Sequence, residues 1–242
     1  MNCFLSLAIF NNKENNKQRK FIFAFFFPFF TLLALWIDSV SFRQNHFDGR
    51  ILTNFLAILY FVLFFLSASS YLRKLMFCMV FLSYIGELIF CKALGMYMYR
   101  TSDIPLYVPF GHAIVYASGF VLAETKLIVN NEITSKKIFS VAFALLFLSV
   151  GIVLKDVFSL IFGLFFFGLM KRKKGQNVYY TIALCVIFIE LVGTYFKCWT
   201  WVPKTFNLIP AANPPMGAVF FYAGGDVILA KIVSYWKSNT TD

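Results

Sequence analysis

Residues 87–124 read ELIFCKALGMYMYRTSDIPLYVPFGHAIVYASGFVLAE, and residues 190–231 read ELVGTYFKCWTWVPKTFNLIPAANPPMGAVFFYAGGDVILAK. The second stretch matches the first at offsets of 102 to 106 residues, so that only small insertions separate the two copies. The matched positions are Glu87 and Glu190, Tyr97 and Trp199, Tyr99 and Trp201, Pro105 and Pro210, Gly111 and Gly217, Tyr116 and Tyr222, and Gly119 and Gly225. Self-similarity of this extent predicts an internal duplication.

The rest of the chain is unusually apolar. Of its 242 residues, 60% are hydrophobic, 20% are aromatic and only 14% are charged, and the mean hydropathy is +0.74. A soluble domain carries about 25% charged residues, so the composition excludes a soluble enzyme, a secreted disulfide scaffold and a disordered chain. The net charge of +11 could indicate a nucleic-acid partner. However, the cations lie in clusters between long apolar runs, and we therefore expect no nucleic-acid partner.

Eight apolar runs are candidates for transmembrane helices, each of which needs about 20 mostly apolar residues. A single helix over 138–170 would be about 50 Å long and would contain Lys155 and Asp156, so this region is expected to form two short helices in a hairpin. The predicted spans are 21–37, 51–69, 75–96, 106–124, 138–154, 157–170, 178–198 and 214–232.

These spans predict an all-α polytopic membrane protein with about eight transmembrane helices. Four spans in each copy keep the same direction across the membrane, so we expect two parallel four-helix repeats related by an axis along the membrane normal. The repeats would occupy 21–130 and 131–236, between an N-terminal tail (1–20) and a C-terminal tail (237–242). The helices that carry Glu87 and Glu190 are expected to pack against each other in the centre. Re-entrant segments at 106–124 and 214–232 would instead invert the repeats.

The distribution of Lys and Arg predicts that both termini are cytoplasmic. With eight spans, fifteen of the 22 basic residues fall on the side of the termini, and seven fall on the other side. The basic run at 171–174 fits a membrane anchor of this kind, although it could also bind anionic lipid headgroups.

Acidic side chains inside apolar spans are the strongest candidates for a functional site, because ionisable groups in a membrane are costly. Glu87, Glu190 and Asp226 are such residues, and the two glutamates match in the duplication. We predict Glu87 and Glu190 as an acid–base pair, with His112 as an assisting group that can exchange protons near neutral pH. The alternative is a structural role, with ion pairs to Lys92, Lys197 or Arg100.

The segments next to the glutamates are rich in aromatic residues and proline. These aromatic side chains could form a belt at the membrane interface, or they could roof a cavity and contact an apolar ligand. The predicted binding residues are Tyr97, Tyr99, Arg100, Tyr116, Trp199, Trp201, Tyr222 and Asp226. A disulfide between Cys91 and Cys198 is possible in an oxidising compartment.

We expect no metal and no cofactor. The chain contains only two histidines and no zinc-ligand spacing, and it lacks a dinucleotide-binding, Walker or nucleophile-elbow motif. Three functions stay open. A transporter of a small solute or of protons ranks first, followed by an intramembrane acid–base enzyme that acts on a lipid or isoprenoid-like substrate, and then by a membrane scaffold or assembly subunit. The partners expected are membrane lipids and a small solute or apolar ligand, and the sequence leaves the oligomeric state open.

Overall fold

The computed structural model describes residues 13–101, 103–173 and 175–238, and it forms an all-α bundle in which 77% of the chain is helical. The longer helices are α2 (Lys13–Ile37), α4 (Arg50–Ser67), α5 (Ser70–Glu87), α6 (Tyr107–Ala123), α8 (Glu132–Val153), α9 (Val157–Lys171), α10 (Gln176–Tyr195) and α11 (Val219–Ser238). The shorter ones are α3 (Val40–Asn45), α7 (Lys126–Asn130), the π-helix η1 (Leu88–Ala93) and the 3₁₀-helix η2 (Met216–Ala218). The described residues also form four short strands: β1 (Tyr97–Tyr99), β2 (Trp199–Trp201), β3 (Lys204–Thr205) and β4 (Ile209–Pro210).

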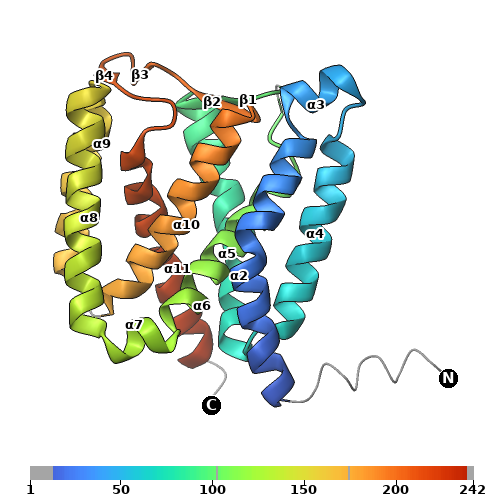
Figure 1. Cartoon of the computed structure of the whole chain (residues 1–242), viewed down its shortest axis with the longest axis vertical. Coiled ribbons are helices and arrows are strands. Elements are labelled where there is room, and N and C mark those ends of the chain that lie inside the picture. Colours follow the sequence, from blue (N-terminus) through green and yellow to red (C-terminus); the bar gives the residue numbers. More distant parts are fainter. Residues whose placement is uncertain (1–12, 102, 174, 239–242) are drawn as a thin grey trace.

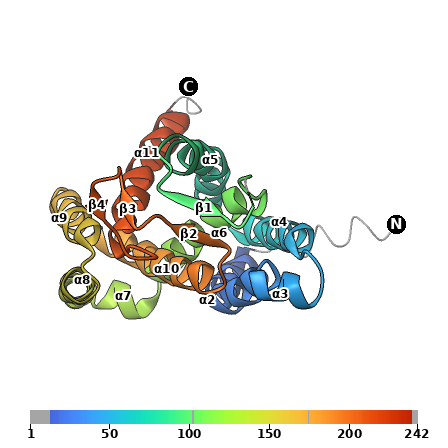
Figure 2. The same ribbon diagram turned by 90° about the horizontal axis from the view of Figure 1, so that it is seen from above.

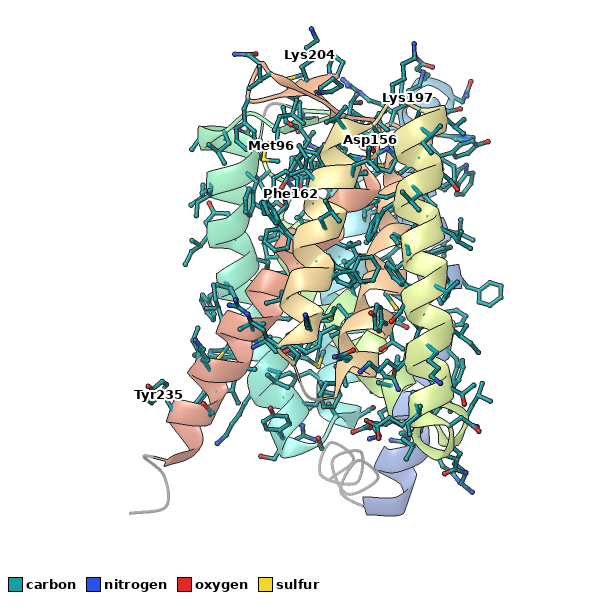
Figure 3. All side chains as sticks on the ribbon, turned by 90° about the vertical axis from the view of Figure 1, so that its left-hand side faces the viewer. Met96, Asp156, Phe162, Lys197, Lys204 and Tyr235 are labelled. Atoms are coloured by element: carbon teal, nitrogen blue, oxygen red, sulfur yellow. The ribbon has the colours of Figure 1, made fainter. Side chains whose placement is uncertain are left out.

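The longer helices run up and down through the bundle (Figure 1). We call the end that carries β1 to β4 and α3 the strand end, and the end that carries α7 and both ends of the described chain the terminus end. Lys197 and Lys204 lie at the strand end, whereas Tyr235 lies near the terminus end (Figure 3). The two antiparallel strand pairs, β1 with β2 and β3 with β4, lie across the strand end when the bundle is seen from above (Figure 2).

Six helices are long and apolar enough to cross a membrane, which indicates an integral, multi-pass membrane protein. They comprise α2, α4, α5 with η1, α8, α10, and α11 with η2. The helices predicted at 106–124 and 157–170 are present as α6 and α9, but with 17 and 15 residues they are shorter than these six. Large apolar side chains such as Phe29, Ile51 and Leu164 are exposed on the outside of the bundle, as expected for a surface in contact with lipid tails.

The central helix is α6, most of whose residues are buried. A helix that is apolar all round is expected inside a bundle. It packs against both α5 and α10. Both glutamate-bearing helices therefore lie around α6 in the centre of the bundle, and they contact α6 more extensively than they contact each other. The small residues of α6 allow this helix to approach α10 closely: a Cβ at Gly119 would lie 2.4 Å from the Cα atom of Ile182 on α10.

Polar side chains shape the turns between helices. Ser69 caps the N-terminus of α5, and the Arg73 guanidinium donates hydrogen bonds to the carbonyl oxygens of Phe65 and Leu66 at the end of α4. At the strand end, the Asp156 side chain accepts a bond from the Ser159 N–H and caps α9. The hairpin predicted at residues 155 and 156 is present: α8 ends at Val153, before this cap, and α9 begins at Val157, after it.

The helix ends differ from the predicted tails. Helix α2 begins at Lys13, so residues 13–20 of the predicted N-terminal tail are helical, while residues 1–12 lie outside the described residues. Helix α11 continues to Ser238, and residues 239–242 of the predicted C-terminal tail lie outside the described residues.

Candidate functional site

The site is built under a two-stranded ribbon, in which Tyr97 pairs with Trp201 and Tyr99 pairs with Trp199. Because side chains alternate between the two faces of a strand, these four aromatic residues share one face, which is directed into the bundle. The ring centroids of Tyr97 and Trp201 are 4.8 Å apart, and those of Tyr99 and Trp199 are 6.2 Å apart. The aromatic side chains therefore roof the bundle interior and do not form a lipid-facing belt.

Glu190 on α10 lies directly below this roof and is 6% exposed. Its Oε2 atom accepts hydrogen bonds from the indole N–H groups of Trp199 (2.9 Å) and Trp201 (3.0 Å). Its Oε1 atom accepts a bond from the Tyr222 hydroxyl at 2.9 Å. An indole nitrogen can only donate, so the protein holds this carboxyl as an acceptor at Oε2.

Gly193 lies one turn after Glu190 and allows Trp199 to reach it. A Cβ at this glycine would lie 2.0 to 2.4 Å from atoms of the Trp199 ring. The indole can therefore lie flat over α10 only because residue 193 has no side chain. Asn213 supports the same strand, β2, since its Oδ1 atom accepts a bond from the Trp201 backbone N–H at 2.9 Å.

Glu87 is the last residue of α5 and is 3% exposed. Its Oε2 atom accepts a hydrogen bond from the Tyr99 hydroxyl at 2.7 Å, and its Oε1 atom lies 3.1 Å from Nε2 of His112 on α6. Burial, followed by the negative charge of Glu87, raises the pKa of the Tyr99 hydroxyl well above its usual value. Tyr99 therefore stays protonated and acts as a donor.

His112 links the two carboxyls. Its ring is stacked on that of Tyr222, with centroids 5.2 Å apart and an angle of 14° between the planes, and the Tyr222 hydroxyl bonds to Glu190. A continuous set of contacts thus runs from Glu87 through His112 and Tyr222 to Glu190. The matched glutamates of the two sequence stretches are brought to one site, together with all four ribbon aromatics, His112 and Tyr222.

Two cavities adjoin this set of residues. A small chamber of about 70 Å³ is lined by both glutamates and by Thr31 and Thr53. A larger cavity of about 340 Å³ lies between α5 with η1 and α11, and its walls are mostly apolar. Glu87, Tyr97, His112 and Tyr222 line both cavities, so they form the partition between them.

The remaining predicted binding residues form no hydrogen bond with the two glutamates within the described part of the chain. Asp226 lines the larger cavity, one helical turn beyond Tyr222 on α11. Tyr116 lies in the core, with its ring stacked on that of Phe120 at 6.3 Å between centroids. Arg100 lies at the strand end and forms ion pairs with Asp38 (2.8 Å) and Asp48 (2.6 Å). Arg100 is therefore engaged with these two aspartates at the strand end.

Sequence reasoning missed the Asp38 network at the strand end. Asp38 is fully buried and accepts hydrogen bonds from Arg50, Arg100 and the Tyr107 hydroxyl. Burial alone would lower the pKa of Arg100, but its bonds to Asp48 and Asp38 raise it above the usual value. The available signal was an acid directly after the first apolar run and an arginine directly before the second.

The thiols of Cys91 and Cys198 are free, and the Cys198 Sγ–H donates to the Leu35 carbonyl oxygen at 3.2 Å. Within the described ranges, no three side chains from His, Cys, Asp and Glu lie together as metal ligands would.

Comparisons with protein-family models, with curated proteins and with solved structures found no match to this chain.

Proposed function

We propose that this membrane protein is an acid–base enzyme that acts on an apolar lipid or isoprenoid-like substrate within the bilayer. The observation that carries the proposal is the pairing of Glu87 with His112 at the wall of the larger cavity. A carboxyl and an imidazole 3.1 Å apart can exchange a proton. The adjoining apolar walls suit a hydrocarbon substrate.

The two glutamates have different roles in this proposal. Glu87 and His112 transfer the proton, because both line the larger cavity and bond to each other. Glu190 acts as a fixed negative group, because three donors hold its oxygen atoms. Glu190 lines only the small chamber, behind the partition, so a fixed anion there stabilises the positive charge of His112 when the imidazole is protonated.

The simplest reaction of this class is the shift of a carbon–carbon double bond. One group delivers a proton to one carbon of the double bond, which leaves positive charge on the other, and a second group removes a proton from the saturated carbon attached to that charged carbon, where the new double bond forms. Atoms and electrons balance without an oxidant, a reductant or another co-reactant. His112 and Glu87 can supply the two functions and then restore their starting protonation states by exchange across their hydrogen bond.

Transport of protons or of a small solute is the second candidate, supported by the small chamber that both glutamates line. A transporter also needs a path to the terminus end. There the described core contains fully buried apolar side chains, including Phe64, Leu75, Leu229 and Val233. These side chains favour a site that opens on one side over a continuous polar path.

For the architecture, we propose eight spans in two parallel four-helix repeats, with both termini cytoplasmic. Support comes from the ribbon: a two-fold axis through an antiparallel pair in this register exchanges Tyr97 with Trp199 and Tyr99 with Trp201, the same matches as in the sequence. The backbone hydrogen bonds that flank the ribbon follow the same two-fold symmetry. The Arg100 N–H donates to the Cys198 carbonyl oxygen at 2.8 Å, and the Val202 N–H donates to the Met96 carbonyl oxygen at 3.0 Å.

The turns before the two strands support the same arrangement. Gly95 and Lys197 precede β1 and β2 by two residues, and both have a φ of 57°. The orientation is supported by the split of fifteen to seven basic residues.

Deuterium exchange tests the proposed chemistry. Purified protein in liposomes that contain unsaturated isoprenoid hydrocarbons and alcohols is incubated in D2O, and mass spectrometry follows deuterium uptake into the lipids. We expect uptake with the wild type and a loss of about 100-fold or more for Glu87→Gln. Glu132→Gln is the matched control, since Glu132 is an exposed acid at the start of α8.

The other two functions give different results in the same liposomes. A transporter would dissipate a pH or solute gradient without any deuterium in the lipids, and Glu87→Gln would stop that flux. A scaffold would show neither activity, and a variant in which glutamine replaces both Glu87 and Glu190 would fold and assemble normally. Either outcome would overturn the enzyme proposal.

A further inference from the structure

The larger cavity lies beside one of two matched glycines whose surroundings differ. Gly119 on α6 and Gly225 on α11 occupy equivalent positions in the two similar stretches. A Cβ at Gly119 would collide with the Ile182 backbone, so α6 and α10 are closely packed there. A Cβ at Gly225 would meet no atom within 4 Å. The corresponding space between α11 and α5 is therefore open.

This open space is accessible from the lipid-facing side of the bundle. Ile85, Ile89 and Ile228 line the larger cavity and are also 46 to 52% exposed on the outside. Phe90 and Phe221 form part of its inner wall, with ring centroids 4.9 Å apart. An apolar molecule can thus enter from the bilayer between α5 and α11 without crossing water.

Asp226 is an exceptional residue in this wall. Its side chain is buried, with 4% exposure, and its Oδ2 atom has no hydrogen-bond partner among the described residues. An unpaired polar atom in an apolar setting destabilises a protein, so its presence beside a cavity points to a ligand that satisfies it. Asp226 follows Tyr222 by four residues, which places it about 6 Å further along α11 from the strand end.

We propose that the larger cavity binds an apolar alcohol, whose hydroxyl group forms a hydrogen bond with the side-chain carboxyl of Asp226. A hydroxyl both donates and accepts, so it pairs with a carboxylate and equally with a protonated carboxyl. A ligand carboxylate would be repelled, and an ammonium group would require more acceptors than this one carboxyl offers. The hydrocarbon part lies against Phe90 and Phe221, toward Glu87 and His112. This inference rests on the proposed function in that the same cavity receives the substrate.

Binding is measured without turnover. Trp201 lines the cavity, so a long-chain alcohol with bromine atoms on its chain will quench the Trp201 fluorescence when it binds. Trp36 and Trp236, which are exposed, are first replaced by phenylalanine. The probes are the bromoalcohol and the bromoalkane of the same chain length. We expect the protein to bind the alcohol more tightly than the alkane by about tenfold or more.

Two variants separate the hydroxyl contact from the shape of the cavity. Asp226→Leu removes the acceptor, and it should abolish the preference for the alcohol while leaving alkane binding nearly unchanged. Gly225→Leu fills the cavity and should abolish the binding of both probes. Gly168→Leu is the matched control, because a Cβ at Gly168 on α9 also meets no atom within 4 Å, and it should bind both probes like the wild type.

The inference is wrong if the wild type binds both probes equally, or if Asp226→Leu keeps the preference for the alcohol. Glu87→Gln separates this result from the proposed function, because it should still prefer the alcohol while losing deuterium exchange. Alcohol binding without any deuterium exchange by the wild type would retain the binding site and reject the enzyme. Deuterium exchange without a preference for the alcohol would retain the enzyme and reject the alcohol-binding site.

Discussion

Replacing Glu190 tests whether its carboxyl is held by donors that have no other partner. In Glu190→Leu, the indole N–H groups of Trp199 and Trp201 lose the oxygen atom to which both donate. Both tryptophans are buried. A buried donor left without a partner costs about 1–3 kcal/mol, so the two together should lower the free energy of unfolding by about 2–6 kcal/mol.

Glu190→Gln should have a much smaller effect. Glutamine keeps one carbonyl oxygen, which can accept both indole bonds, and its amide can donate to the Tyr222 hydroxyl, which also accepts. The loss of charge from the hydrogen bonds is opposed by the relief of burying a charge. For a protein of this size, about 1 kcal/mol corresponds to 2–4 °C. We therefore expect Glu190→Gln to melt within about 4 °C of the wild type and Glu190→Leu to melt at least about 4 °C lower.

The assay is thermal unfolding of detergent-purified protein in the presence of a thiol-reactive dye. Cys185 and Cys198 are free and buried, so they react when the bundle opens. If Glu190→Leu melts like the wild type, the indole bonds contribute nothing measurable and the argument fails. If Glu190→Gln loses as much stability as Glu190→Leu, the carboxylate charge itself is structural, and its role as a fixed functional anion is refuted.

Three further predictions concern topology, packing and pH. A cysteine introduced at Asn207 should be labelled by an impermeant reagent from outside the cell and one at Gly175 should not; labelling of the latter from outside would reverse the proposed orientation. Gly119→Ala should destabilise the protein by about 1–3 kcal/mol through overpacking, whereas Gly225→Ala should melt at or above the wild-type temperature; equal effects would contradict the difference in packing. The Arg100 hydrogen bond lowers the pKa of Asp48 below its usual value, so this carboxylate stabilises the fold above about pH 4 and the contribution is lost as the pH falls through the lowered pKa. Melting temperatures should therefore fall less steeply below about pH 5 in Asp48→Asn, and identical profiles would exclude this contribution.

The positions of the helices could be predicted from the sequence because lipid imposes a strict condition on the backbone. Every N–H and C=O group in the hydrocarbon region must be bonded internally, so each long apolar run forms a helix. The hairpin at Asp156 follows from the same limit on helix length. Glu87 and Glu190 could also be selected as candidates, because an acid inside such a run is costly wherever the helix packs.

The tertiary structure alone decided which groups meet those acids and where space remains between the helices. Trp199 and Trp201 reach Glu190 because the β1–β2 ribbon folds over the bundle and Gly193 leaves room for an indole, whereas Tyr222 reaches it from α11. No residue spacing specifies such contacts, since they depend on the rotation of each helix about its axis. Gly119 and Gly225 are equivalent in the sequence, yet one is closely packed and the other faces a cavity. Helix packing is a property of both partners at once, so only the assembled bundle determines which of two similar interfaces closes.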